Sequence, residues 1–395
     1  MNRGLSLYLD LLRFSAALEV FAYHLTMLTG WPATQPIFAS FGHEAVVVFF
    51  VLSGYVIGYA ARNRDKTPER YAVSRLTRIY SVAIPALLLT VALDHFGYSL
   101  NPVVYDGFAP LHSPMLRFGI SVFLLNETWH SVQAFSNGPY WSVCYELLYY
   151  AIFAFYFFFD GRMRRFLLVA SLLLAGPRAL LLLPVWVMGS LAFFETRSRR
   201  WPSVLHWILF LLPVLGFWLY ANAPIANITV RLAAAVFGWT TAAVDLGHSR
   251  QALSDWYLGV LLALHFVGAK NLQLELERCL SWIARPFHVC ADFTFTLYLV
   301  HLPNPVRDST HGPERSMAAG GYRADCRRGH GDTGYYHRKA ATPAQAAGRT
   351  GHVRSAPSVT WRVVRSRRVR PEPAAHCSRP AFCLIRIGPG HARRA

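Results

Sequence analysis

Two ionisable side chains, Arg13 and His24, lie inside an apolar run near the N-terminus, residues 9–25. They are eleven residues apart, close to three turns of an α-helix, so both point to the same face. At 1.5 Å per residue, they lie about 16 Å apart along the helix axis. An ionisable group within a membrane helix costs roughly 3 kcal/mol or more unless it faces a partner or a cavity. The pair therefore predicts a functional site.

A cation and an imidazole at this spacing fit a ligand with a phosphorylated head and a long thin arm. Coenzyme A has this shape, with phosphates at one end and the thioester at the other. Arg13 would hold a phosphate through two parallel hydrogen bonds, helped by Arg75 and Arg78. His24 would take the proton of an acceptor hydroxyl, because an imidazole titrates near neutral pH. The alternatives are that Arg13 only extends to the membrane interface and that His24 is a hydrogen-bonded packing residue.

A second polar group occurs in the stretch WSVCYE, where Ser142 and Glu146 are four residues apart and share one helix face. Three roles stay open for this group. Glu146 could orient an imidazole, as the carboxylate of a catalytic triad does. It could instead bind sugar hydroxyls, or Trp141 could anchor the helix at the membrane interface.

These residues need helices to position them, and the composition predicts a polytopic membrane protein. Of the 395 residues, 54% are hydrophobic and only 15% are charged, whereas an ordinary soluble domain is about a quarter charged. Apolar runs such as 45–60 and 151–159 have no polar face at helical spacing, which argues against a soluble helical protein.

The apolar runs predict an all-α bundle of about ten transmembrane helices. Basic clusters, including residues 61–78, place the N-terminus in the cytoplasm, because Lys and Arg concentrate in cytoplasmic loops. Gly176-Pro177 and Ala223-Pro224 mark turns. The predicted spans are 8–29, 43–60, 80–96, 141–160, 166–176, 180–195, 203–221, 227–245, 256–269 and one that begins at about 291.

The composition changes near Pro305. Residues 1–305 have a net charge of +5, whereas residues 306–395 have +13 and no apolar run long enough to span a bilayer. We therefore predict a transmembrane domain, 1–305, and a basic disordered tail, 306–395. The tail is either a genuine basic segment, able to bind anionic lipid or nucleic acid through charge alone, or the out-of-frame translation of a GC-rich gene.

Five motifs in residues 5–305 resemble those of the acyltransferase-3 family of integral-membrane acyltransferases. They are Arg-x10-His at 13–24, FFVLSGYVIG at 49–58, RLTR at 75–78, WSVCYELLYY at 141–150 and YLVH at 298–301. The resemblance implies transfer of an acyl group from cytoplasmic acyl-CoA to hydroxyls of cell-surface sugars, lipopolysaccharide or similar acceptors. It also implies that the first-helix arginine and histidine are essential.

The sequence departs from the family pattern at two places. Val47 stands where the family usually has an acidic residue, and Glu44, one helical turn earlier, could substitute for it. Glu19 stands where the family is usually apolar, about 140° around the helix from His24. We expect Glu19 to pair with another helix or to face a polar cavity.

Taken together, these observations predict an acyl-CoA-dependent O-acyltransferase of the bacterial inner membrane, with acetyl-CoA as the expected co-substrate. No metal site and no nucleic-acid partner are predicted; the partners are the bilayer and a carbohydrate or glycolipid acceptor. The alternatives are a transporter that uses buried Arg, Glu and His as a proton path and an inactive, truncated acyltransferase. The predicted catalytic residues are His24 and Glu146, and the predicted substrate-binding residues are Arg13, Arg75, Arg78, Trp141 and Ser142.

Overall fold

The computed structural model describes residues 2–29, 40–102, 105, 113–223, 228–229, 231–232, 235 and 246–301. All named elements in these ranges are helical, which confirms the all-α prediction. The predicted tail, its boundary at residue 305 and most of the predicted span 227–245 lie outside the described residues. The α-helices are α1 (Arg3–Thr29), α2 (Gly42–Asn63), α3 (Pro68–Leu100), α5 (Pro114–Val122), α6 (Tyr140–Phe158), α7 (Gly161–Phe194), α8 (Ser203–Asn222), α10 (Ala252–Asn271), α11 (Gln273–Leu280) and α12 (Ala284–Val300).

The lengths and apolar character of these helices indicate a multi-pass membrane protein. Six described segments are long and apolar enough to cross a bilayer: α2, α3, α6, α7, α8 and Gly247–Asn271, which joins the 3-10 helix η3 (Gly247–Gln251) to α10. The predicted count of about ten crossings is not confirmed. Two helices outside the six are α1, which carries three charged residues in its middle, and α12, which has 17 residues.

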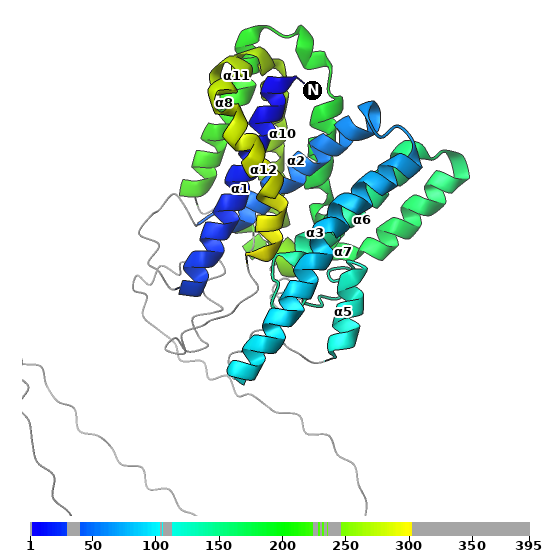
Figure 1. The fold of residues 1–395 in the computed structure, drawn as a ribbon. Coiled ribbons are helices and arrows are strands. Elements are labelled where there is room, and N and C mark those ends of the chain that lie inside the picture. Colours follow the sequence, from blue (N-terminus) through cyan, green and yellow to red (C-terminus); the bar gives the residue numbers. More distant parts are fainter. Residues whose placement is uncertain are drawn as a thin grey trace, which may run out of the picture. The chain divides into compact units, whose positions relative to one another are not determined.

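Helix α7 contains a sharp turn at Gly176, where the sequence predicts one. Gly176 has a φ of +70°, in the left-handed region that a glycine adopts without steric cost. Figure 1 shows that the chain turns back here, so that both ends of α7 lie at the same end of the bundle. The two predicted segments, 166–176 and 180–195, are therefore the two arms of one element.

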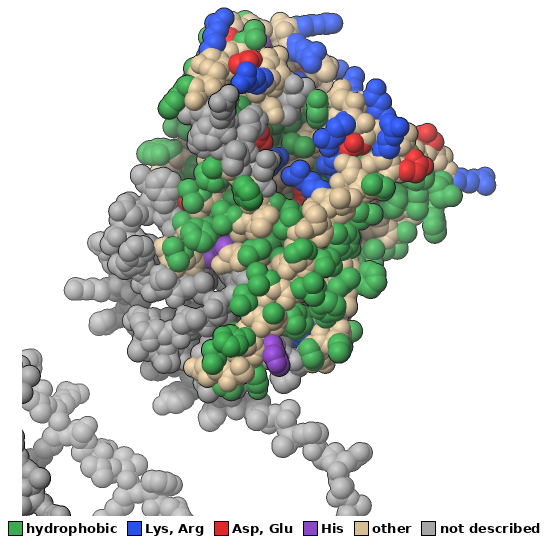
Figure 2. Space-filling view, viewed as in Figure 1, with side chains coloured by type: hydrophobic (Ala, Val, Ile, Leu, Met, Phe, Trp, Pro, Cys, Tyr) green, Lys and Arg blue, Asp and Glu red, His purple; other side chains and the backbone are tan. Residues whose placement is uncertain are grey.

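The basic segments gather at one end of the described bundle. The N-terminus and the α2–α3, α6–α7 and α7–α8 connections all lie at the upper end in Figure 1. Lys and Arg side chains cover the same end in Figure 2, whereas hydrophobic side chains dominate the surface below it. This one-sided distribution is the pattern that a membrane protein shows when its basic loops face the cytoplasm.

The structure corrects the start of the third helix. The sequence predicts a span of 80–96 after a basic loop, but α3 begins at Pro68 and includes most of that basic segment. The Thr67 side chain accepts a hydrogen bond from the Arg70 backbone N–H, and Pro68 occupies the first turn. Both are strong helix-start signals. The extension makes Arg75 and Arg78 helical residues with fixed directions.

Helix α2 packs closely against α7 through two glycines. A Cβ atom on Gly54 would lie 2.0 Å from the Trp186 carbonyl oxygen, and one on Gly189 would lie 1.8 Å from the Val51 carbonyl oxygen. Neither position has room for a side chain, so the two backbones meet directly, as small residues allow between membrane helices. This contact fixes the position of Ser53, which precedes Gly54.

The loop between α5 and α6 is attached to the turn of α7 by a buried ion pair. Glu127 and Arg178 lie 3.2 Å apart and are both shielded from solvent. Burial raises the pKa of the Glu127 carboxyl, although Ser131 and Arg178 oppose the shift. The pair holds the loop that leads into α6 against the point where α7 reverses.

Candidate functional site

A cavity lies among α1, α2, α3, α6 and α12, and Figure 2 shows a hollow bordered by basic side chains near the basic end. Its empty volume is about 760 Å³, including the part open to solvent. Apolar residues of α2, among them Phe49, Phe50 and Leu52, form much of its wall. Five of the predicted site residues line it: Arg13, Arg75, Arg78, Ser142 and Glu146.

Three arginines from two helices converge on this cavity. Arg13 of α1 pairs with Asp10 at 3.2 Å, and it experiences repulsion from Arg78 of α3. Arg75 is buried and pairs with Asp65 at 2.9 Å, whereas Arg78 is exposed. The buried Nε of Arg75 has no hydrogen-bond partner among the described residues. Convergent cations with an unused donor favour an anionic ligand such as a phosphate.

Glu146 lies at the centre of a hydrogen-bond network across the cavity wall. Its Oε1 accepts a hydrogen bond from the Ser53 hydroxyl at 2.9 Å and another from the Tyr150 hydroxyl. Ser53 also accepts a hydrogen bond from the Trp186 indole at 3.2 Å. In the described part of the chain, the hydrogen-bond partners of Glu146 are these hydroxyls and not a histidine. Whether Glu146 binds substrate hydroxyls or acts on a proton stays a prediction.

Ser142 and Trp141 occupy adjacent positions with different surroundings. Ser142 lines the cavity, and its hydroxyl lies 2.7 Å from the hydroxyl of Tyr298 on α12. Trp141 does not line the cavity; its ring stacks on His248, with centroids 4.3 Å apart and planes 3° apart. The predicted substrate-binding role of Trp141 stays untested; its ring also meets the rings of Phe50 and Tyr145 edge-on.

His24 contacts a second histidine rather than a carboxylate. Its Nδ1 lies 2.9 Å from the Val20 carbonyl oxygen and 3.0 Å from Nε2 of His301. His301 lies one helical turn beyond Tyr298, which lines the cavity. The predicted base thus lies next to the helix that forms one cavity wall. The sequence contained His301 in the YLVH motif but gave no indication of its partner.

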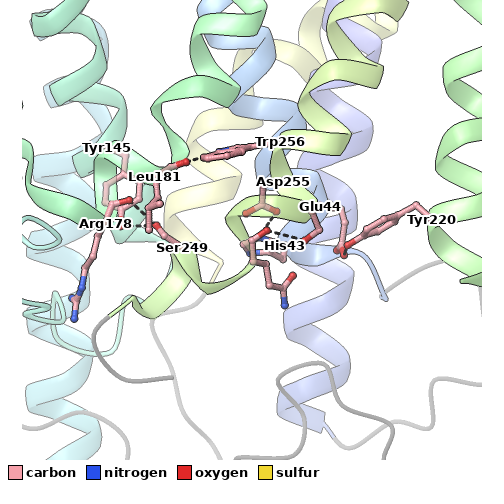
Figure 3. Close-up of polar contacts among 11 residues, drawn as sticks. His43, Glu44, Tyr145, Arg178, Leu181, Tyr220, Ser249, Asp255 and Trp256 are labelled. Atoms are coloured by element: carbon pink, nitrogen blue, oxygen red, sulfur yellow. Dashed lines mark hydrogen bonds and ion pairs between the residues drawn. The ribbon is translucent and has the colours of Figure 1, made fainter. Parts of the chain in front are cut away.

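Two carboxylates of the central helices make contacts that Figure 3 shows together. His43 of α2 donates a hydrogen bond from Nε2 to the buried Asp255 carboxylate of α10 at 2.9 Å, and Glu44 accepts a hydrogen bond from Tyr220 at 2.8 Å. Glu44 is therefore engaged with α8. The His43–Asp255 pair joins residues 212 positions apart, so the sequence offered no spacing signal for it.

Glu19 acts on the start of α2. Its carboxylate accepts hydrogen bonds from the backbone N–H groups of Ser40 and Phe41 at 3.0 and 2.8 Å. These groups directly precede Gly42, where α2 begins, and a carboxylate at a helix N-terminus is stabilising. The expectation that Glu19 pairs with another helix is confirmed, and its position explains an ionisable residue at an otherwise apolar site.

Comparison with known proteins gives one family and three relatives. Residues 6–304 match the acyltransferase-3 family, described as an acyltransferase domain. An O-acetyl transferase of Shigella phage Sf6 is 32% identical over 36% of this chain and 43% of its own length. Acyltransferase MdmB of Streptomyces mycarofaciens is 29% identical over 36% of each chain. The exopolysaccharide production protein ExoZ of Rhizobium meliloti (strain 1021) is 27% identical over 66% of this chain and 75% of its own.

The chain spans less than half the length of the first two relatives, and no solved structure matches it. The family match, in contrast, covers the cavity-lining residues of all five helices around the cavity, including α1, which also bears His24.

Proposed function

The chain belongs to the acyltransferase-3 family, and on that premise we propose that it transfers an acyl group from acyl-CoA to a hydroxyl of a carbohydrate or similar acceptor. The acyl group we expect is acetyl. The names of two relatives, an O-acetyl transferase and an exopolysaccharide production protein, support the acyl group and the acceptor class respectively.

The observation that carries the proposal is the cavity itself. It opens among arginines at the basic end of the bundle, and its α12 wall leads toward the His24–His301 pair. Arg13 and His24 lie about 16 Å apart on one helix face. This arrangement suits a donor with charged phosphates, a long pantetheine arm and a reactive thioester at the far end.

The arginines would hold the donor. Arg75 is fixed by Asp65, and its free Nε can donate to a phosphate oxygen. The exposed Arg78 side chain can change its conformation to meet the ligand. Arg13 adds a third positive charge to the cavity from α1. The repulsion among these cations is relieved when a polyanion binds, which adds to the affinity.

His24 would act as the base. Its imidazole takes the proton of the acceptor hydroxyl, the oxygen attacks the thioester carbonyl, and the carbon–sulfur bond breaks with coenzyme A leaving as its thiolate. The imidazolium then returns its proton to the sulfur. The acceptor is expected on the side opposite the basic loops, and we place the protein in the bacterial inner membrane with the predicted ten or so crossings.

The test is label transfer from [14C]acetyl-CoA in membranes from cells that express the full chain. We expect label on a glycan fraction, and we expect His24→Ala to reduce transfer by roughly 100-fold or more. His95→Ala is the matched control, because His95 is an exposed histidine of α3 that does not line the cavity.

Two outcomes would count against the proposal. Transfer by His24→Ala at the rate of the unchanged chain would remove the base assigned here. No transfer by the unchanged chain, in membranes in which it is folded and inserted, would count against the acyltransferase activity itself.

A further inference from the structure

We infer that His301, which directly follows α12, is a positioning residue for His24: it stabilises one protonation state of that imidazole and shares its proton during acyl transfer. The inference rests on the proposed function and adds a partner to the base. Its direct observation is the 3.0 Å contact between Nδ1 of His24 and Nε2 of His301, between residues 277 positions apart.

The surrounding carbonyl groups decide which nitrogens carry hydrogen. Nδ1 of His24 lies 2.9 Å from the Val20 carbonyl oxygen, and Nδ1 of His301 lies 3.1 Å from the Leu297 carbonyl oxygen. A carbonyl oxygen only accepts hydrogen bonds, so each Nδ1 carries its ring's hydrogen in the neutral state. Each Nε2 then has a free lone pair.

This assignment orients the pair. The Nε2 lone pair of His301 accepts from the Nδ1–H of His24, which is shared with the Val20 carbonyl. The Nε2 of His24 has no hydrogen-bond partner among the described side chains and backbone groups, so it is the nitrogen available as base. His301 therefore reinforces the tautomer that the Val20 carbonyl favours, as the second partner of a catalytic imidazole commonly does.

The pair also provides a place for the proton. When Nε2 of His24 takes a proton from the acceptor hydroxyl, the ring becomes an imidazolium with hydrogen on both nitrogens. Its Nδ1–H can then pass to Nε2 of His301, which leaves His24 neutral with its hydrogen on Nε2. His24 gives that hydrogen to the departing sulfur, and His301 returns its own to Nδ1 of His24, so both rings end as they began.

In a Ser-His-Asp triad a carboxylate orients the imidazole and stabilises the imidazolium without taking its proton, but the described carboxylates near this site are engaged elsewhere. The carboxylate–imidazole pair that the described residues contain is His43–Asp255, shown in Figure 3. Glu146 receives its hydrogen bonds from Ser53 and Tyr150. A neutral partner avoids burying a further charge beside His24, which would be costly in a membrane.

Helix α12 is held so that His301 keeps its position. The Asn137 side chain donates a hydrogen bond of 2.9 Å to the Leu299 carbonyl oxygen, two residues before His301. The Tyr298 hydroxyl pairs with Ser142 of α6. The ring of Phe21 meets that of His301 edge-on, with centroids 6.1 Å apart. Contacts from three other segments thus fix the turn that carries the imidazole.

The first arm of the test compares two replacements of His301 in the [14C]acetyl-CoA transfer assay. In His301→Gln, the amide oxygen can reach the place of Nε2 and accept the hydrogen bond, although it cannot take the proton. His301→Leu has a similar volume and no acceptor. We expect kcat to fall about tenfold in His301→Gln and roughly 100-fold in His301→Leu. The KM for acetyl-CoA should stay within about twofold in both, because the arginines lie at the other end.

The relative activities of His301→Gln and His301→Leu distinguish a positioning role of His301 from a packing role. If His301 only fills space, leucine retains at least as much activity as glutamine, and the inference is wrong. A large rise in KM for acetyl-CoA without loss of kcat would also contradict it, since His301 would then belong to the donor site.

The second arm does not depend on turnover. The full chain, with 15N-labelled imidazoles and reconstituted in lipid nanodiscs, is examined by NMR, and the His24 signals are identified by their absence in His24→Gln. We expect neutral His24 to carry hydrogen on Nδ1, and His301→Leu to change its Nδ1 shift. Hydrogen on Nε2 instead would overturn the inference. If the unchanged chain transfers no label, the proposed function fails, whereas this spectrum still decides the pairing.

Discussion

The two ends of the candidate site are built in different ways. At the arginine end, each ion pair joins residues close in sequence, Arg13 with Asp10 and Arg75 with Asp65. At the histidine end, the partners His24 and His301 are 277 positions apart. The charges that would hold a donor are thus fixed within one or two helices, whereas the groups that would move protons depend on the packing of the bundle.

From this difference we expect some mutations to change only donor binding and others to change the stability of the whole bundle. A change at the arginine end should alter donor binding, with a stability effect only where a buried partner loses its charge. A change in the helix contacts behind the histidines should lower stability and turnover together. The following variants are ordered from the largest expected effect to the smallest.

Arg75→Ala should lower stability by about 3–5 kcal/mol, because it leaves the buried Asp65 carboxylate without its main partner. It should also raise the KM for acetyl-CoA. Arg78→Ala is the matched variant: Arg78 lines the same cavity but is exposed, so KM should rise with little change in stability. Thermal unfolding in detergent and KM measurements check both. Equal stability of the two variants would show that the Arg75–Asp65 pair is not needed for folding.

Gly54→Ala should destabilise the protein by about 1–3 kcal/mol, because the new Cβ would lie 2.0 Å from the Trp186 carbonyl oxygen and force α2 away from α7. Since α2 carries Ser53, the hydrogen-bond partner of Glu146, turnover should fall as well. Gly119→Ala in α5 is the control, with nothing within 4 Å of its Cβ. An unfolding temperature of Gly54→Ala equal to that of the control would mean that the close α2–α7 contact is not present.

Asn137→Ala removes the donor to the Leu299 carbonyl oxygen and should cost about 1 kcal/mol. The loss loosens the turn that bears His301, so kcat should fall a fewfold while the KM for acetyl-CoA stays unchanged. Kinetics on the detergent-solubilised chain provide the check. If KM rises and kcat is retained, this loop supports the donor end rather than the histidine end.

Glu127→Gln should change the pH dependence of stability. Burial raises the pKa of Glu127 above its ordinary value of 4.5, so the folded chain binds this proton more tightly than the unfolded chain does. The free energy of unfolding should therefore fall as pH rises from about 4.5 through the raised pKa, and then level off. The variant should lack this component. Identical slopes of unfolding temperature against pH in both proteins would contradict the assignment.

The sequence predicted much of the fold because the signals for helices are local. The apolar runs placed α2, α6, α8 and α10 within a few residues of their observed limits, and Gly176-Pro177 marked the reversal in α7. The prediction for the start of α3 was wrong because the charged segment before residue 80 was interpreted as a loop. Thr67 and Pro68 in that segment are typical of a helix N-terminus and would have indicated the earlier start.

The site was predictable in the same local sense. Helical spacing and short motifs identified five residues that line the cavity, and their roles stay predictions. What the sequence could not supply was partners between helices. The contacts of Glu146 with Ser53, of His24 with His301 and of Trp141 with His248 depend on how the bundle packs, and no spacing along the chain encodes them.

The most direct test of the central claim is the affinity of the full chain for acetyl-CoA, measured by titration calorimetry in lipid nanodiscs. We expect Arg13→Ala to weaken binding about tenfold or more, because a charge-assisted contact is lost, and His24→Ala to bind as the unchanged chain does. If His24→Ala weakens binding as much as Arg13→Ala does, or neither changes it, the division into a donor-holding end and a proton-moving end is wrong.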